Sequence, residues 1–179
     1  MKSITIAILG RPNVGKSTLF NRLVGSKKSI VSDMEGVTRD RVYGKLDWLE
    51  RSYSVVDTGG YIPKSNDIIE NQVRIQAEIA SRESDVIIFV IDGRVDLTSN
   101  DLVLSKLIKK TNKPVVLAVN KIDNLDDENN NLQFHEMGFG DYVSVSAESG
   151  RNIGILLDKI DHFCPDVKEN ILKDDFVSF

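Results

Sequence analysis

The amino-acid composition excludes several classes of protein through what it lacks. Cys164 is the only cysteine among 179 residues, so no internal disulfide can form, which fits a reducing compartment. No apolar run approaches the roughly 18 residues that a membrane span needs. The net charge is −4, so the chain lacks the basic excess of a general nucleic-acid binder. We therefore expect a cytoplasmic chain that does not enter a membrane and binds RNA weakly or not at all on its own.

The composition that remains is that of a folded domain. Hydrophobic residues make up 41% and charged residues 28% of the sequence, which is typical of a globular chain rather than a disordered one. The N-terminal apolar run leads directly into a glycine-rich motif, which favours a first strand over a signal peptide. We assign residues 1–164 to one domain. Residues 165–179 are charged and weakly patterned, as in a tail or the start of a linker.

Apolar periodicity predicts strands alternating with helices along the chain. Two nearly continuous apolar runs, DVIIFVID and PVVLAVN, have the pattern of strands buried on both faces of a parallel sheet. This alternation favours a three-layer α/β fold with a mostly parallel, six-stranded sheet flanked by helices. The expected strands are 4–9, 41–48, 52–57, 85–92, 114–120 and 142–147, with a hairpin around LER at 49–51. The expected helices are 16–25, 68–83, 98–111 and a final one from Ile153 to Phe163.

The segment GRPNVGKS at 10–17 matches the pattern G-x-x-x-x-G-K-[ST], directly after one predicted strand and before a helix. Its glycines allow the backbone to wrap around phosphate, and the helix N-terminus attracts anions. Lys16 would bridge the β and γ phosphates, and the Ser17 hydroxyl would bind Mg²⁺. A chance match in a chain of this length arises on the order of 1% of the time. The residues expected to contact the phosphates are Gly10, Asn13, Val14, Gly15, Lys16, Ser17 and Thr18.

The segment DTGG at 57–60 follows another predicted strand. Asp57 lies at the carboxyl end of its predicted strand, where ligands bind in parallel sheets, and its carboxylate would help to hold Mg²⁺. The Gly60 N–H would donate to the γ-phosphate. In the Ras-type switch the next residue is a glutamine that orients the attacking water. Here the next residue is Tyr61, which has no amide and which we expect to pack away from the nucleotide.

The segment NKID at 120–123 ends a third predicted strand and points to guanine. The Asp123 carboxylate can accept hydrogen bonds from N1–H and N2–H₂ of guanine, and adenine offers neither, so guanine should be favoured by roughly two orders of magnitude or more. Asn120 would tie this loop to the phosphate loop, and the Lys121 stem would cover the base. After the last predicted strand, in SAES, the Ala147 N–H could meet guanine O6. The residues expected around the base are Asn120, Lys121, Asp123, Ser146, Ala147 and Glu148.

These motifs, in this order, resemble those of the Ras-like GTPases of the P-loop class. The segments GRPNVGKSTLFNRL, GVTRDR, DTGG, VNKID and SAESGRNI are similar to the first GTPase domain of the Der (EngA) family of bacterial ribosome-assembly GTPases, over nearly all of residues 4–163. The resemblance implies GTP hydrolysis, with Thr38 closing over Mg²⁺ and the γ-phosphate, and a role in assembly of the large ribosomal subunit. It also implies a second GTPase domain and a C-terminal domain in the longer protein, of which this chain would be a fragment. DMEG at 33–36 departs from the usual Asp-Thr-Pro-Gly of the family.

The resemblance also suggests how hydrolysis proceeds without the glutamine. Asn13 matches an asparagine that binds K⁺ near the phosphates in related families, and Thr38 with backbone groups such as the Gly60 N–H would position the water. Lys16 and Asn13 complete the expected catalytic set. Arg11 is expected to point to solvent rather than to act as an arginine finger, and Arg39 is not assigned.

Other functions remain open from the sequence. One is a regulatory module that binds GTP and GDP with negligible turnover, which Tyr61 motivates. Another is a domain of the Era or tRNA-modification type, although GVTRDR counts against it. The absence of a spanning segment disfavours a membrane-transport GTPase, and Asp123 disfavours an ATPase.

Overall fold

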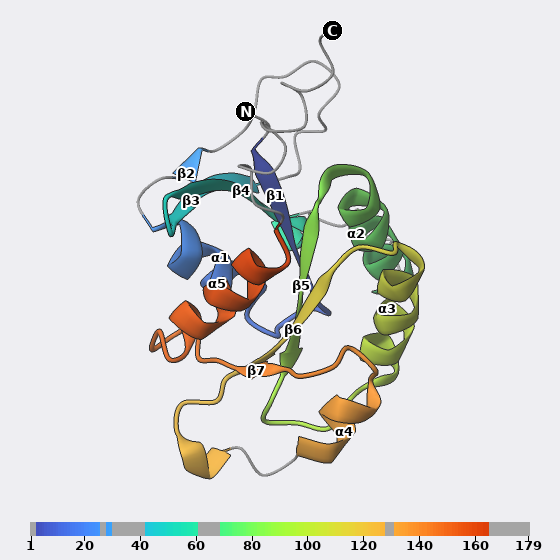
Figure 1. Ribbon diagram of the computed structural model, residues 1–179. Coiled ribbons are helices and arrows are strands. Elements are labelled where there is room, and N and C mark those ends of the chain that lie inside the picture. Colours follow the sequence, from blue (N-terminus) through green and yellow to red (C-terminus); the bar gives the residue numbers. More distant parts are fainter. Residues whose placement is uncertain (1–2, 26–27, 30–41, 61–68, 128–130, 165–179) are drawn as a thin grey trace, which may run out of the picture.

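The computed structural model describes residues 3–25, 28–29, 42–60, 69–127 and 131–164, and a central sheet organises them (Figure 1). Its strands are β1 Ile4–Leu9, β2 Lys28–Ser29, β3 Val42–Trp48, β4 Arg51–Asp57, β5 Val86–Asp92, β6 Val115–Asn120 and β7 Val143–Ser144. Across the described residues these seven strands lie in the order β2-β3-β4-β1-β5-β6-β7. The segment from β4 to β7 is parallel, whereas β2, β3 and β4 pair antiparallel.

The predicted α/β class and the mostly parallel sheet are therefore confirmed, and all six expected strands are present. One strand was not predicted: β2, which is two residues long and lies at the edge of the sheet beside β3. A strand this short leaves no alternating pattern in the sequence, so periodicity cannot reveal it.

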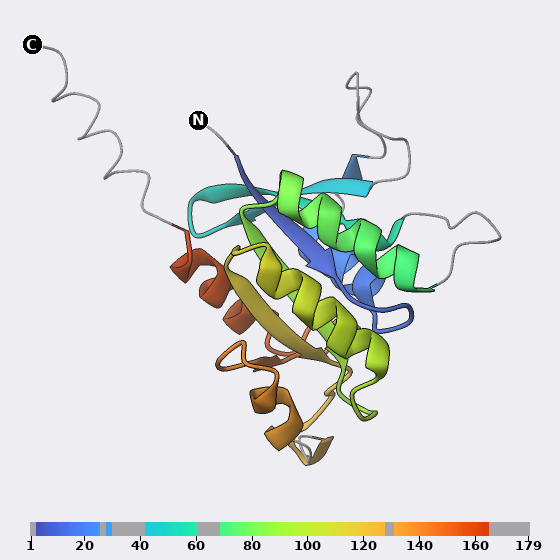
Figure 2. The same cartoon turned by 90° about the vertical axis from the view of Figure 1, so that its right-hand side faces the viewer.

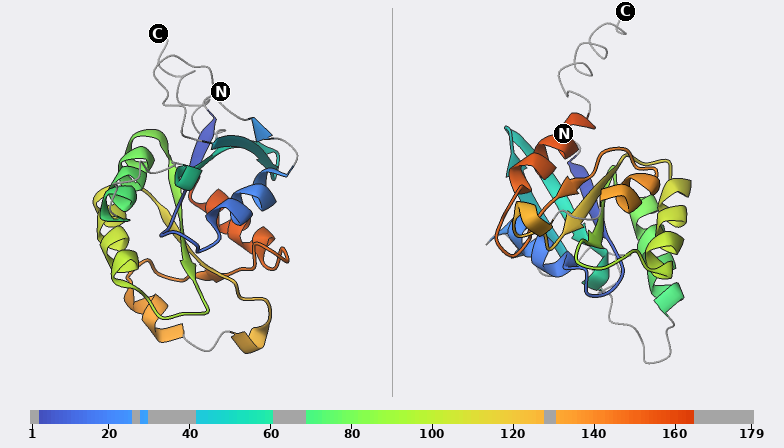
Figure 3. Two further views of the ribbon diagram at one scale, coloured as in Figure 1. Left: turned by 180° about the vertical axis from the view of Figure 1, so that it is seen from behind. Right: turned by 90° about the horizontal axis from the view of Figure 1, so that it is seen from below.

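Helices cover both faces of the sheet. The helices are α1 Lys16–Val24, α2 Ile69–Glu83, α3 Ser99–Lys110, α4 Asn131–Glu136 and α5 Ile153–His162, with short 3-10 turns at Thr58–Gly60 and Leu125–Asp127. Helices α1 and α5 lie on one face, and α2 and α3 lie side by side on the other (Figures 1 and 2). Figure 3 shows the same three layers from behind and from below. Within the described segments, no helix has the length and apolarity needed to cross a membrane.

The core is divided in two by the sheet, because successive strand residues point to opposite faces. Ile6 and Ile8 pack in the cluster under α1 and α5, whereas Ala7 and Leu9 pack in the cluster under α2 and α3. Strand β5 lies between two parallel neighbours and is buried from Val86 to Ile91. This burial on both faces accounts for the continuous apolar run in its sequence.

Most boundaries lie within one residue of the sequence prediction, and the hairpin and β7 show the two differences that change a connection. The hairpin turn consists of Leu49 and Glu50 alone, both at positive φ, and Arg51 already belongs to β4. Strand β7 ends at Ser144 rather than at residue 147. Beyond it the chain folds back, with the Gly150 N–H donating to the Ser146 carbonyl at 2.8 Å. That turn, rather than a longer strand, presents the loop after β7 to the edge of the sheet.

The carboxyl ends of the parallel strands define one edge of the molecule. The loop after β1 carries Gly10 to Gly15, β4 ends at Asp57, and β6 ends at Asn120. Ligands of open parallel sheets bind at this edge, where adjacent connections leave a crevice. The motifs GRPNVGKS, DTGG and NKID therefore reach the same edge.

Candidate nucleotide-binding site

The loop between β1 and α1 has the backbone geometry expected of a phosphate-binding loop. Asn13 and Gly15 adopt positive φ angles of 68° and 99°, and Gly15 is the N-cap of α1. No side chain caps this helix, so its first N–H groups point outward. Together with the helix dipole, such donors are suited to an anion.

Gly15 is required by space as well as by backbone conformation. A Cβ atom at this position would lie 2.3 Å from Nδ2 of Asn120. The side chain of Asn120 therefore passes directly over the glycine, and any larger residue would displace it.

Asn120 joins three loops. Its Nδ2 donates to the Val14 carbonyl at 2.9 Å, and its Oδ1 accepts from the Ala147 N–H at 2.9 Å. The side chain is buried, with 3% of its surface exposed. The predicted tie between the base loop and the phosphate loop is confirmed. The Ala147 N–H, which we expected at guanine O6, donates in this structure to Asn120.

Lys16 lies folded within the phosphate loop. Its ammonium donates to the carbonyl of Gly10 and, at 3.1 Å, to that of Arg11. Burial lowers the pKa of Lys16 from 10.5 to about 8, since desolvation penalises the cation; nearby Asp57 raises the pKa and Arg11 lowers it further. A polyphosphate beside this ammonium would replace its missing hydration.

Asp57 and Ser17 offer oxygen ligands beside Lys16. The Ser17 hydroxyl lies 3.3 Å from Oδ2 of Asp57, and Oδ1 of Asp57 accepts from the Gly59 N–H at 2.9 Å. Asp57 is 4% exposed. A hydroxyl beside a carboxylate suits Mg²⁺, which prefers oxygen ligands and completes its shell with water and phosphate. The described residues contain no cluster of three or more His, Cys, Asp or Glu that could hold a metal ion.

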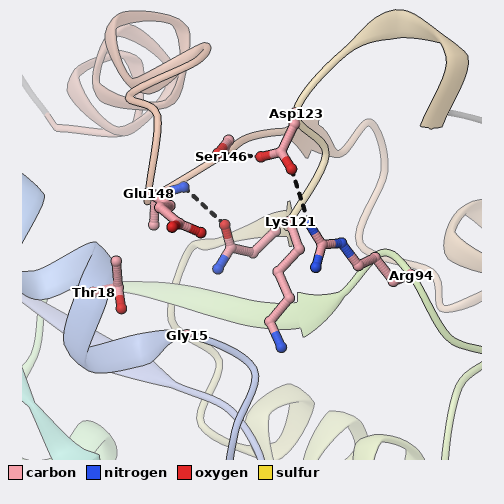
Figure 4. A pocket seen from close by; sticks show the side chains of 9 residues that line it. Gly15, Thr18, Arg94, Lys121, Asp123, Ser146 and Glu148 are labelled. Carbon is pink, nitrogen blue, oxygen red and sulfur yellow. Dashed lines mark hydrogen bonds and ion pairs between the residues drawn. The ribbon is translucent and has the colours of Figure 1, made fainter.

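Two adjoining pockets occupy this edge. The phosphate pocket has a volume of about 520 Å³ and is lined by Pro12, Asn13, Gly15, Lys16, Ser17, Thr18, Gly59 and Lys121. The base pocket has a volume of about 480 Å³ and is lined by Gly15, Thr18, Arg94, Asn120, Lys121, Asp123, Ser146, Ala147 and Glu148 (Figure 4). Three of these residues, Gly15, Thr18 and Lys121, line both pockets. The Lys121 ammonium donates to the Asn13 carbonyl at 2.8 Å, which fixes its stem between the two.

Asp123 has both carboxylate oxygens engaged at the mouth of the base pocket. Oδ1 accepts from the Ser146 hydroxyl at 2.8 Å, and Oδ2 accepts from Nη2 of Arg94 at 2.8 Å (Figure 4). These two donors, first Ser146 and then Arg94, hold the pKa of Asp123 below its usual range against the opposing effect of desolvation. The carboxylate is therefore ionised at neutral pH and can act as an acceptor.

Sequence reasoning missed two side chains of the site. Arg94 lies two residues after the end of β5, so its position close to a strand end was the one available signal. Gln76 of α2 is buried, and its Oε1 accepts from the Gly10 N–H at 3.2 Å and contacts the Thr58 hydroxyl at 3.1 Å. No motif marks Gln76, which links α2 to the start of the phosphate loop.

The expectation that Arg11 points to solvent is wrong. Its Nε lies 3.3 Å from Oδ2 of Asp101, and its side chain is only 16% exposed. Asp101 also accepts from the backbone N–H of Thr98 in the capping box of α3. A buried carboxylate needs a partner, so it draws the arginine inward.

Several predicted site residues lie outside the described residues, namely Thr38, Tyr61, the segments 33–36 and 36–41, and Arg39. Gly60 closes the 3-10 turn after β4, at the end of a described segment.

The parallel sheet, the phosphate loop and the joined base loop define a Ras-like P-loop nucleotide-binding domain. Residues 5–121 match the family described as 50S ribosome-binding GTPase. The chain belongs to this family.

Individual relatives agree with this assignment. Over 177 residues the chain is 47% identical to the GTPase Der of Clostridium perfringens, covering 99% of this chain and 40% of the relative. It is 50% identical over 155 residues to the GTPase Der of Clostridium acetobutylicum, covering 87% and 35%. The resemblance to the Der family is thus confirmed, and the chain spans about 40% of the length of the first of these relatives.

A solved structure shares the fold. A tyrosine-to-alanine variant of Era from Aquifex aeolicus, bound to GDP·AlF4⁻, superposes with a TM-score of 0.71 at 34% identity. The match covers 93% of this chain and 58% of that chain.

Proposed function

We propose that this domain, assigned to residues 1–164, binds GTP and GDP with Mg²⁺ and hydrolyses GTP. The observation that carries the proposal is the double hydrogen bond of Asn120, which joins the phosphate pocket to a pocket containing the Asp123 carboxylate. A guanine base, a ribose and a polyphosphate form one continuous ligand, and two joined pockets of about 480 and 520 Å³ match its two ends.

Each part of the nucleotide has residues suited to it. The N–H groups at the start of α1 and the Lys16 ammonium would contact the phosphates. Ser17 and Asp57, with Thr38, would hold Mg²⁺, which neutralises phosphate charge when bound. The carboxylate of Asp123 would accept from the N1–H and N2–H₂ of guanine, with Ser146 fixing its orientation. The remaining contacts would come from Gly10, Val14, Thr18, Lys121, Ala147 and Glu148.

Hydrolysis requires stabilisation of charge on the transferred phosphoryl group. Asn13 is exposed on the rim of the phosphate pocket. Its backbone has a φ of 68°, and its own carbonyl accepts a hydrogen bond from the Lys121 ammonium. Its amide oxygen suits a large monovalent cation, and we propose that it binds K⁺, which would supply positive charge near the phosphates. The Gly60 N–H and Thr38 would position the water.

The second candidate is a binding module without appreciable turnover, favoured by the tyrosine at position 61. Phosphate release from GTP with Mg²⁺, in KCl and in matched NaCl, separates the two. We expect faster turnover in KCl, lost in Asn13→Ala while GDP affinity is largely kept. Equally slow release in both salts would support the binding module instead.

The cellular role is also a proposal. The family description names the 50S ribosomal subunit, and the relatives are named GTPase Der. We therefore propose that a longer, cytoplasmic protein containing this domain acts in large-subunit assembly. The whole chain has a net charge of −4, so the domain itself would bind RNA weakly. Salt-sensitive, tight binding of ribosomal RNA by this domain alone would contradict that view.

A further inference from the structure

Arg94 is held where the base pocket opens. Its backbone N–H donates to Oδ1 of Asp92 at 2.9 Å, at the carboxyl end of β5. The neighbouring Gly93 N–H donates to the Asn120 carbonyl at 2.8 Å, which fixes the turn against β6. From this anchored turn the side chain extends to Asp123, with 57% of its surface exposed (Figure 4). The backbone is therefore fixed while the guanidinium can leave.

The guanidinium resembles the ligand that Asp123 is expected to recognise. Guanine offers a carboxylate two parallel donors, N1–H and N2–H₂, attached to the carbon between them. A guanidinium offers the same pair of parallel N–H donors, with a positive charge added. In the structure Nη2 of Arg94 lies 2.8 Å from Oδ2 of Asp123, while Oδ1 already accepts from Ser146. Arg94 thus occupies the oxygen that the base needs.

Among the described residues that line the base pocket, the other cation, Lys121, does not compete for this oxygen. The Lys121 ammonium donates to Oδ2 of Asp92 at 3.0 Å and to the Asn13 carbonyl at 2.8 Å, which directs it away from Asp123. Asp92 thereby holds both the Arg94 backbone and the Lys121 side chain. Among the described lining residues of the base pocket, Arg94 is the cation paired with Asp123.

We propose that Arg94 is an internal competitor of guanine, which must release Asp123 before the base can bind. This inference rests on the proposed function, because it assigns Asp123 to guanine recognition. The fraction of molecules in which Arg94 has left Asp123 then limits the apparent affinity for the nucleotide and its association rate. Once the base is bound, Arg94 has no contact with Asp123, so the dissociation rate does not depend on it.

The size of the effect follows from the exposure of the pair. Exposed ion pairs shift equilibria by about 1.5- to 5-fold. Arg94→Gln should therefore bind GDP about 1.5- to 5-fold more tightly. The direction of the change in GDP affinity is diagnostic. If Arg94 merely attracted the phosphates, its removal would weaken GDP binding instead of strengthening it.

Stopped-flow binding of GDP with a fluorescent group on its ribose tests the proposal. We expect Arg94→Gln to associate about 1.5- to 5-fold faster than wild type with an unchanged dissociation rate, and the ratio should approach one as KCl is raised. Lys106→Gln, on the exposed face of α3, removes the same charge elsewhere and should match wild type. Unchanged or slower association in Arg94→Gln, or faster dissociation, would overturn the proposal.

A second ligand isolates the contact with Asp123. In Asp123→Asn the amide can pair with N1–H and the C2 carbonyl of xanthine, and the carboxylate that attracts Arg94 is gone. Xanthosine diphosphate binding to Asp123→Asn should therefore be insensitive to Arg94→Gln, and an equal gain in both backgrounds would contradict the mechanism. Failure of wild type to bind GDP would refute the proposed function, whereas equal GDP binding by wild type and by Arg94→Gln would refute this inference alone.

Discussion

Nδ2 of Asn120 donates to the carbonyl of Val14 across 106 residues of sequence, and the same side chain accepts from Ala147. We predict that Asn120→Ala lowers the free energy of unfolding by about 2 kcal/mol or more, because a buried carbonyl and a buried N–H lose their partner together. Urea denaturation measures this loss. Asn21→Ala, on an exposed position of α1, is the matched control and should change stability by less than about 0.5 kcal/mol. Equal stability of the two variants would show that the hydrogen bonds of Asn120 do not stabilise the fold.

The depressed pKa of Lys16 makes stability depend on pH. The folded chain releases this proton near pH 8 and the unfolded chain near 10.5, so between these values the unfolded chain binds more protons. The free energy of unfolding attributable to Lys16 therefore rises with pH across this window, and the cost of burying the cation is fully present below pH 8. In Lys16→Met this cost is absent. We expect the stability advantage of Lys16→Met over wild type to be largest near pH 7 and to shrink towards pH 10; a gap independent of pH would contradict it.

The turn of the β3–β4 hairpin contains backbone strain that substitution can relieve. Leu49 and Glu50 have φ angles of 46° and 63°, a conformation that favours Asn and Gly, and Leu49 is 60% exposed. The double variant Leu49→Asn, Glu50→Gly should raise the free energy of unfolding by about 1 kcal/mol. Leu49→Ala retains the strain and should show no such gain in the same thermal or urea unfolding experiment.

The ion pair of Arg11 with Asp101 connects the phosphate loop to the first turn of α3. Arg11→Met would leave the carboxylate of Asp101 buried without its cation and should cost about 2 kcal/mol of stability. Arg74→Met, on an exposed position of α2, is the comparison. If both variants unfold at the same urea concentration, the pair contributes nothing.

The sequence was sufficient for features that depend on local pattern. Continuous apolar runs predicted β5 and β6, and the motif context predicted the phosphate loop and the tie made by Asn120. These features follow from periodicity and from short motifs; the Asn120 tie could be predicted although it spans 106 residues, because both of its ends lie in such motifs.

The contacts that it did not predict join distant segments through side chains. Arg11 meets Asp101 across 90 residues, and Gln76 reaches Gly10 across 66. Arg94 finds Asp123 because β5 and β6 are paired in register, with Asp92 opposite Asn120. Such pairs depend on strand order and turn geometry, which hydrophobic patterning does not specify.

The most direct test of a guanine-nucleotide site is calorimetric titration of the purified chain with GDP and with ADP, both in Mg²⁺. The account predicts that GDP binds at least about 100-fold more tightly than ADP, because adenine cannot satisfy the carboxylate of Asp123. The preference should disappear in Asp123→Ala. Equal affinity for the two nucleotides in wild type, or no binding of either, would contradict the account.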